Sequence, residues 1–152
     1  MTKPVGYGDG KKLFIKGTEK KGSYNPIGLA PEQYDTIVIA EGWATAARIH
    51  HITGFTCAAA FDAGNLKDVA VGFYKKYPNA QIVIAADNDR FVEGNPGVRL
   101  ARIAASESGA CVAIPRFRTD SDGTDFDDLF SEDGAEEVKR QILSQIPVDA
   151  SE

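Results

Sequence analysis

Two aspartates separated by a single residue, Asp87 and Asp89, follow a short apolar stretch, residues 81–86 (QIVIAA). Two carboxylates at this spacing can project toward the same side when the backbone between them is extended. Hard oxygen ligands of this kind are those that Mg²⁺ or Mn²⁺ prefers. Asp and Asn are also common where a strand ends in a turn, so a plain turn is the alternative interpretation. The position directly after an apolar strand favours the metal site.

A glutamate and a glycine, Glu41 and Gly42, follow a second apolar stretch, residues 36–40 (TIVIA). Glu41 is expected to bind the metal, or to act as a general acid or base if neighbouring carboxylates raise its pKa. The alternative is a glutamate that only opens a helix, where a negative charge is favourable. Gly42 has no side chain, so a ligand can come close to the backbone there.

Loops after the other apolar stretches add further candidates. Gly64 and Asn65 either form a loop that ends in a helix N-cap or offer backbone N–H groups to a phosphate. Asp125 and Asp127 lie in an acidic region between Arg118 and Lys139, which is either a solvated tail or a source of metal ligands. Several arginines are candidates for phosphate contacts: Arg90, Arg99, Arg102, Arg116 and Arg118.

Short apolar stretches alternate with segments of helical periodicity. Strands are expected at residues 36–40, 55–60, 81–86 and 110–114, and helices at 43–51, 66–73, 98–108 and 135–146. Continuously apolar strands joined by helices indicate an α/β fold with a parallel sheet covered on both faces. Ligands of such sheets bind beyond the carboxyl ends of the strands, so the acidic residues should share one edge.

Two segments lie outside this alternation. Residues 12–16 and 23–27 are predicted to pair as an N-terminal β-hairpin, with Pro26 at an edge position, and residues 1–10 show no periodicity. A short turn is expected around residues 125–130.

The composition narrows the class of protein. The chain has 152 residues, a formal net charge of −5, and 43% hydrophobic and 26% charged residues, as globular domains have. No apolar run approaches the roughly 20 residues that a membrane span needs. Cys57 and Cys111 have no CxxC partner, which favours reduced, buried thiols in a cytoplasmic protein. Nucleic-acid-binding proteins are usually basic, so any such surface must be local or lie on another domain.

Four motifs, in the same order, resemble the Toprim domain shared by bacterial-type primases, topoisomerases and some nucleases. They are EGWATAA at 41–47, AFDAGNL at 60–66, ADND at 86–89 with NPG at 95–97, and DFDDL at 125–129. The likeness is strongest to primases of conjugative plasmids and phages and covers roughly residues 35–130. It implies a Rossmann-like Toprim fold: a central, mostly parallel four-stranded sheet flanked by helices, with a short N-terminal β-hairpin.

The resemblance implies metal-dependent nucleotidyl transfer, in which an RNA primer is made on single-stranded DNA. Glu41, Asp87 and Asp89 match the family's catalytic and metal-binding acidic positions. Asp125 and Asp127 would hold a second metal or position the first. The expected cofactor is Mg²⁺ or Mn²⁺. A Toprim nuclease and a non-catalytic metal- or partner-binding module are the alternatives.

The expected substrate-binding residues are Gly42, Gly64, Asn65 and Arg90. The expected partners are nucleotides, a single-stranded DNA template and other domains of a larger parent protein, such as zinc-binding or helicase modules. No zinc ligand set and no GxxxxGK[ST] motif occurs in this sequence. The implied division is an N-terminal extension (1–34), a Toprim core (35–130) and a C-terminal helix and tail (131–152).

Overall fold

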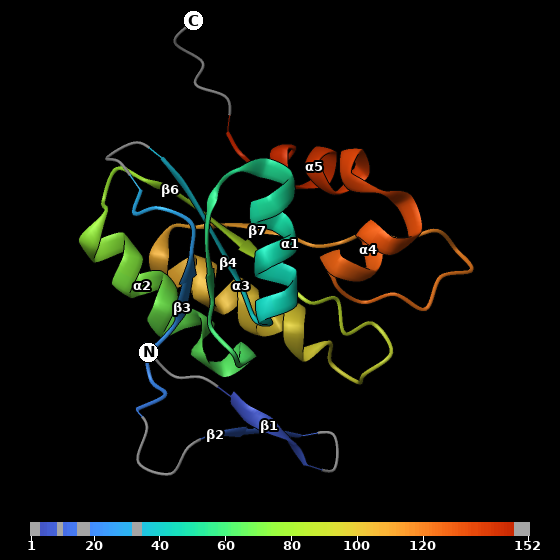
Figure 1. The fold of residues 1–152 in the computed structure, drawn as a ribbon, viewed down its shortest axis with the longest axis horizontal. Helices are drawn as coiled ribbons and strands as arrows, with labels where there is room; N and C mark the ends of the chain where they lie inside the picture. Colours follow the sequence, from blue (N-terminus) through green and yellow to red (C-terminus); the bar gives the residue numbers. More distant parts are fainter. Residues whose placement is uncertain (1–3, 9–10, 15–18, 32–34, 148–152) are drawn as a thin grey trace, which may run out of the picture.

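Five short strands form one sheet in the computed structural model, which describes residues 4–8, 11–14, 19–31 and 35–147 (Figure 1). In sheet order the strands are β3 (Asn25–Ile27), β5 (Thr56–Ala59), β4 (Thr36–Ala40), β6 (Gln81–Ala85) and β7 (Cys111–Ala113). The pairs β5–β4, β4–β6 and β6–β7 are parallel. The predicted parallel α/β sheet is therefore confirmed.

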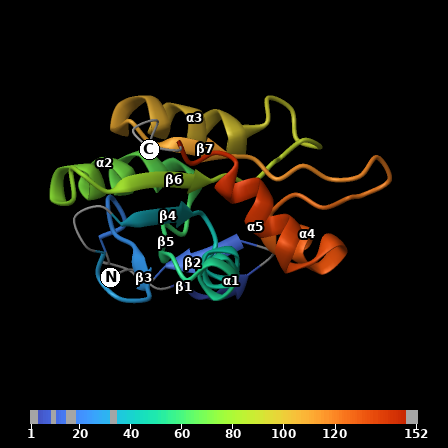
Figure 2. The same cartoon turned by 90° about the horizontal axis from the view of Figure 1, so that it is seen from above.

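Helices cover both faces of this sheet (Figures 1 and 2). Helices α2 (Leu66–Lys76) and α3 (Pro96–Ser108) pack on one face, against side chains such as Ile37 and Ile84. Helices α1 (Trp43–Thr53), α4 (Phe126–Asp133) and α5 (Ala135–Leu143) pack on the other, against side chains such as Val38 and Val83. Successive strand residues point to opposite faces, so a strand that is apolar throughout supplies both cores.

The ends of the predicted helices are set by local chemistry. Gly54 closes α1 at φ 74° and Gly109 closes α3 at φ 73°, a left-handed conformation that glycine adopts without steric cost. Pro96 occupies the first turn of α3, where its missing N–H has no intrahelical partner to lose. Helices 43–51 and 98–108 were thus predictable to within two residues at each end.

The turn expected at residues 125–130 is instead the beginning of a helix. Asp125 caps α4: its Oδ1 accepts a hydrogen bond from the backbone N–H of Asp128 at 2.8 Å. The Asp128 carboxylate in turn accepts from the backbone N–H of Asp125 at 3.3 Å. This reciprocal capping box satisfies two orphan donors, and it stabilises the first turn of a helix whose sequence otherwise reads as an acidic loop.

The predicted pairing of residues 12–16 with residues 23–27 in an N-terminal hairpin is wrong. Strand β2 (Lys11–Phe14) pairs antiparallel with β1 (Pro4–Gly8), in the segment where no structure was expected. Residues 25–27 form β3, which pairs antiparallel with β5 and adds a fifth strand to the predicted four. A hairpin can be predicted from two neighbouring stretches and a short turn. The pairing of β3 depends instead on core residues far away in the sequence, which the pattern of residues 12–27 does not reveal. The edge position predicted from Pro26 is confirmed.

The proposed division of the chain into three parts stays a prediction. Val138 and Ile142 of α5 are fully buried in the same cluster as Phe126 and Leu129 of α4. The two cysteines are free, and burial raises the pKa of the Cys57 thiol to about 12. Among the described residues, no helix is long and apolar enough to cross a membrane.

Candidate metal and active site

The structure brings the predicted acidic residues to one edge of the sheet. Strands β4 and β6 are parallel and paired through to Ala40 and Ala85, so the residues that follow them emerge side by side. Glu41 follows β4, and Asp87 follows β6 after one further residue. This edge is the carboxyl end of the parallel strands, where ligands of open α/β sheets bind.

Asp87 is the buried carboxyl of this edge on which the charges of three other carboxylates act. Burial raises the pKa of its carboxyl from 3.8 to about 8, with further contributions from the negative charges of Glu41, Asp125 and Asp89. A side-chain hydrogen bond with Glu41 acts in the same direction. The Oδ1 atom of Asp87 is buried and has no hydrogen-bond partner among the described residues. A buried oxygen without a partner is costly, and a bound cation would relieve that cost.

Asp89 is fixed by the beginning of α3. Its Oδ2 accepts a hydrogen bond from the backbone N–H of Gly97 at 2.7 Å. Asn88, between the two aspartates, accepts from the side-chain amide of Asn95 at 2.9 Å and donates to the carbonyl of Pro115 at 3.1 Å. The loop after β6 is therefore held from both sides, which sets the directions of Asp87 and Asp89.

The two aspartates at the beginning of α4 have different environments. Burial raises the pKa of Asp125, which also contributes to the field at Asp87. Asp127 instead forms an ion pair with Arg48 of α1, with Nε and Oδ1 2.9 Å apart. The Arg48 guanidinium also lies over the ring of Phe130, 3.9 Å from its centroid. Asp125 thus joins the acidic edge, whereas Asp127 is engaged between α1 and α4.

In both glycines predicted to bind substrate, a backbone group is already engaged in a hydrogen bond. Gly42 precedes α1, and its carbonyl accepts the first helical hydrogen bond from Ala46 at 3.1 Å. The backbone N–H of Gly64, expected to face a phosphate, donates to Oδ1 of Asp62 at 2.7 Å. Any phosphate at that position would have to displace the Asp62 carboxylate.

Asn65 and Arg90 also make internal contacts. Asn65 is 3% exposed, and its amide bonds to Gly22, Ser23 and Ala60 in place of capping α2. Arg90 donates to the carbonyls of Ser121 and Gly123 at 2.8 and 2.9 Å. Its guanidinium also lies 4.9 Å from the centroid of the Phe117 ring. Both side chains hold one segment of the chain against another, so their predicted contact with substrate stays a prediction.

We expect Asn65→Ala to lower the free energy of unfolding by about 2–4 kcal/mol. The substitution removes the side chain that accepts from the partly buried Gly22 N–H at 2.7 Å and donates to the Ser23 carbonyl at 2.8 Å and to the buried Ala60 carbonyl at 3.1 Å. These backbone groups would lose their partner. Urea denaturation would measure the change. Gln145→Ala is the matched control, because Gln145 is exposed and, within the described part of the chain, its side-chain amide bonds only to Ser144. It should change stability by less than about 0.5 kcal/mol. Equal effects of the two substitutions would contradict this role of Asn65.

Sequence reasoning missed three residues of this region. Asp128 supports the backbone at Thr124 and Asp125, with its Oδ2 2.9 Å from the Thr124 N–H. The spacing Asp125-x-x-Asp128 before an apolar residue is a capping-box pattern and was available as a signal. Asn88 and Arg48 act through partners 27 and 79 positions away, for which the sequence holds no local signal.

The donor set fits a hard divalent cation. It consists of carboxylate oxygens, with one buried oxygen of Asp87 lacking a partner among the described residues and the charges of Glu41, Asp125 and Asp89 acting on that carboxyl. In the described part of the chain, no group of three or more His, Cys, Asp and Glu side chains is already gathered closely around one point. Binding of a cation would therefore require these carboxylates to move closer together.

Comparison with known proteins identifies the class to which this fold and edge belong. A family model described as the Toprim domain matches residues 36–136, so the chain belongs to the Toprim family. Two relatives are named DNA primase TraC, both from Escherichia coli. One is 38% identical over 115 residues, which cover 72% of this chain and 8% of the relative. The other is 40% identical over 106 residues, 68% of this chain and 10% of the relative.

Solved structures agree on the fold. The primase fragment of the bacteriophage T7 primase-helicase protein matches with a TM-score of 0.54 and 16% identity, over 71% of this chain and 44% of that one. A T7 primase domain in complex with the lagging-strand DNA polymerase, an RNA/DNA hybrid and dTTP also matches with a TM-score of 0.54, over 75% of this chain. The chain is a primase-like Toprim domain, as its motifs predicted, and it spans a tenth or less of the TraC relatives.

Proposed function

We propose that this chain is the catalytic Toprim domain of a DNA primase, which makes RNA primers on single-stranded DNA by metal-dependent nucleotidyl transfer. The observation that carries the proposal is Asp87, whose buried Oδ1 has no partner within the described region and whose carboxyl stands in the field of Glu41, Asp89 and Asp125. Relatives named DNA primase support the assignment.

In this proposal Glu41, Asp87, Asp89 and Asp125 hold Mg²⁺ or Mn²⁺, and Asp127 contributes if it leaves Arg48. The cation, when bound, neutralises the triphosphate and orients the in-line displacement. The primer 3′-oxygen bonds to the α-phosphorus while the bond to pyrophosphate breaks. Glu41, a member of the same cluster, accepts the proton of the 3′-hydroxyl. Gly42 leaves the backbone next to Glu41 open to the nucleotide, while Gly64, Asn65 and Arg90 position the surrounding loops.

The partners follow from the same proposal. They are nucleotides, a single-stranded DNA template and further domains of a parent protein, which would act in the cytoplasm. The matched segment covers a tenth or less of each relative named DNA primase, so zinc-binding and helicase modules would belong to other parts of such a protein.

Primer synthesis by the parent protein tests the proposal. Labelled ribonucleotides and a single-stranded DNA template are incubated with Mg²⁺, with Mn²⁺ or with EDTA, and the same gel reports primer extension and template cleavage. We expect labelled primers only with the divalent cation and only with nucleotides. Cleavage of the DNA without added nucleotides would establish a Toprim nuclease instead. Metal binding with neither reaction would establish a non-catalytic module.

A further inference from the structure

The arginines of the chain fall into two groups by their contacts. Four have partners: Arg48 with Asp127, Arg90 with two carbonyls, Arg118 with Asp133 and Arg140 with Glu137. The other three, Arg99, Arg102 and Arg116, are exposed, and within the described ranges their guanidinium groups make no hydrogen bond, ion pair or ring contact. Arginines without a carboxylate partner remain available to an external anion.

These three arginines lie along one hollowed strip of the surface. Arg99 and Arg102 of α3 line an open groove of about 650 Å³, together with Asn88, Ile103 and Ile114. Ile114 follows β7, the edge strand of the sheet, and also lines a smaller hollow of about 100 Å³ that contains Arg116. The two hollows therefore adjoin at Ile114. Among the described residues, the lining of the larger groove includes two arginines and no carboxylate.

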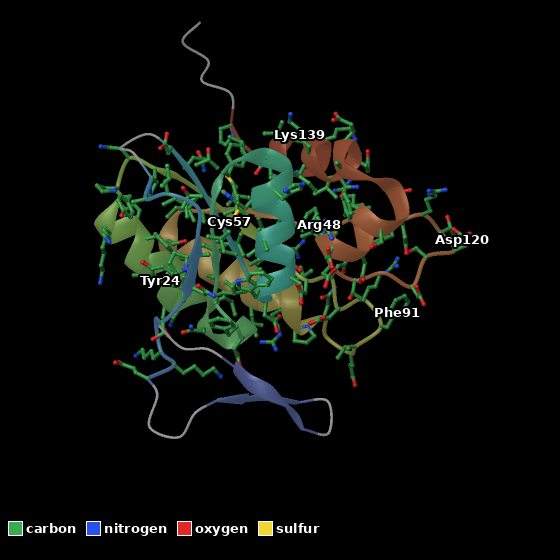
Figure 3. The ribbon with its side chains drawn as sticks, viewed as in Figure 1. Tyr24, Arg48, Cys57, Phe91, Asp120 and Lys139 are labelled. Carbon is green, nitrogen blue, oxygen red and sulfur yellow. The ribbon has the colours of Figure 1, made fainter. Side chains whose placement is uncertain are left out.

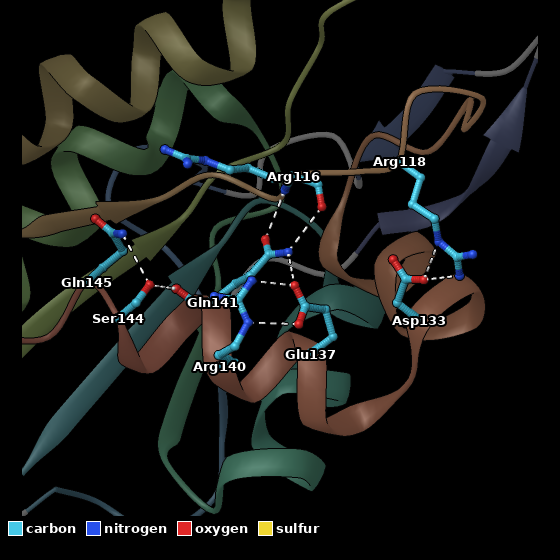
Figure 4. Close-up of polar contacts among 8 residues, drawn as sticks. All are labelled: Arg116, Arg118, Asp133, Glu137, Arg140, Gln141, Ser144 and Gln145. Carbon is cyan, nitrogen blue, oxygen red and sulfur yellow. Dashed lines mark hydrogen bonds and ion pairs between the residues drawn. The ribbon is translucent and has the colours of Figure 1, made fainter.

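The side chain of Arg116 is presented outward by its backbone. Its N–H donates to Gln141 at 2.9 Å and its carbonyl accepts from the same amide at 3.0 Å. Figure 4 shows the guanidinium extended away from Gln141 and from the Arg140–Glu137 pair. The backbone of Arg116 is thus held by Gln141 of α5, while its guanidinium charge has no partner among the described residues.

One end of the strip reaches the acidic edge. Asn88, which lines the groove, stands between Asp87 and Asp89. Arg99 and Arg102 are three residues apart on α3, about 4.5 Å along the helix axis. Along the surface, the strip leads from the carboxylates past Arg99 and Arg102 to Arg116, which follows the edge strand β7. This arrangement suits an extended polyanion better than a single phosphate group.

We propose that the strip formed by Arg99, Arg102 and Arg116 binds the phosphate backbone of a single-stranded nucleic acid and leads it to the acidic edge at Asp87. The side chains of Ile103, which is 43% exposed, and Ile114 offer apolar contact to the bases. Because the chain has a net charge of −5, binding of a nucleic acid needs a local positive surface, and this strip provides one. This inference deepens the proposed function and rests on it for the reason why a strand should reach Asp87.

Binding of labelled oligonucleotides to the full chain tests this proposal without catalysis. Fluorescence anisotropy is measured with dT and rU oligomers of equal length at low salt with EDTA, so that neither metal nor synthesis is involved. We expect each of Arg99→Gln, Arg102→Gln and Arg116→Gln to weaken binding about 3- to 10-fold. Each should also reduce the slope of log K against log salt by about 0.7. A tighter complex with dT identifies the DNA template as the strand, and one with rU identifies the primer.

Arg118→Gln is the matched control, because it removes a positive charge that is also exposed but is already paired with Asp133. It should leave the affinity within twofold of the wild type. Arginine side-chain NMR resonances provide a second readout, in which the Nε–H signals of Arg99, Arg102 and Arg116 shift on titration with dT while that of Arg90 does not. Unchanged resonances at millimolar oligonucleotide, equal losses with Arg118→Gln, or preferential binding of poly-glutamate would overturn the proposal. Failure of primer synthesis alone would leave these binding results intact and would count only against the proposed function.

Discussion

Asp87→Asn is expected to reduce metal-dependent primer synthesis by at least about 100-fold while leaving the fold intact. Asparagine has nearly the same size as aspartate but lacks the negative charge that a divalent cation requires of its ligand. Asp87 is also the residue on which the fields of Glu41, Asp89 and Asp125 converge. Activity is measured in the parent protein, and Mg²⁺ binding is measured in the isolated chain by NMR titration.

The same substitution should change how the stability of the metal-free protein depends on pH. The pKa of Asp87 is raised from 3.8 to about 8, so the folded protein holds a proton that the unfolded chain has already released. Its contribution to stability is fully present below pH 4 and is lost as the pH rises to about 8. The loss is on the order of a few kcal/mol. Asp87→Asn removes this slope, so the metal-free variant should be the more stable protein at pH 8.

Added Mg²⁺ should act in the opposite direction in the wild type. Binding to the ionised carboxylates stabilises the folded state, and the gain increases with pH as the competing proton is lost. Asp120→Asn is the control, because Asp120 is an exposed carboxylate at the tip of the loop before α4, away from the sheet (Figure 3). It should retain both the pH dependence and the response to Mg²⁺. An Asp87→Asn variant that behaves like Asp120→Asn would refute the metal site.

The fold was predictable wherever one segment carries its own signal. Apolar strands such as residues 36–40 and 81–86 are buried on both faces, and that burial dictates their continuous hydrophobicity. Gly54 and Gly109 mark helix ends because their backbone is left-handed. The fifth strand was not predictable, because β3 is paired with a strand about 30 residues away and is supported by Asn65. Nothing within residues 23–27 distinguishes that partner from β2.

The candidate site divides in the same way. Glu41 and Asp87 share an edge because parallel strands end on the same side, a rule that needs only the order of strands and helices. The internal roles of Asn65 and Arg90 depend on contacts with residues 22–23 and 121–123. An amide or a guanidinium on a loop carries the same local signal whether it contacts a phosphate or a distant carbonyl. Only tertiary structure separates the unpaired Arg99, Arg102 and Arg116 from their paired counterparts.

Gly97→Ala is expected to lower the free energy of unfolding by about 3 kcal/mol or more and to weaken Mg²⁺ binding. A Cβ atom at Gly97 would lie 2.3 Å from the carbonyl oxygen of Asp87 and 2.8 Å from Oδ2 of Asp89. The first of these neighbours is backbone and cannot rotate away, so the loop after β6 or the beginning of α3 must move. Either movement disturbs the hydrogen bond that fixes Asp89 to the Gly97 N–H.

Gly72→Ala provides the matched comparison, because Gly72 is exposed in α2 and an added Cβ meets nothing within 4 Å. Alanine is the better helix former there, so this variant should be more stable by up to about 1 kcal/mol, with unchanged Mg²⁺ affinity. Urea denaturation and Mg²⁺ titration of both variants separate a general glycine effect from the close packing at Asp87. If Gly97→Ala is as stable as the wild type and binds Mg²⁺ equally well, the contact between α3 and the aspartate loop does not position the acidic edge. The direction of Asp89 would then be set from the β7 side, by the bond of Asn88 to the Pro115 carbonyl.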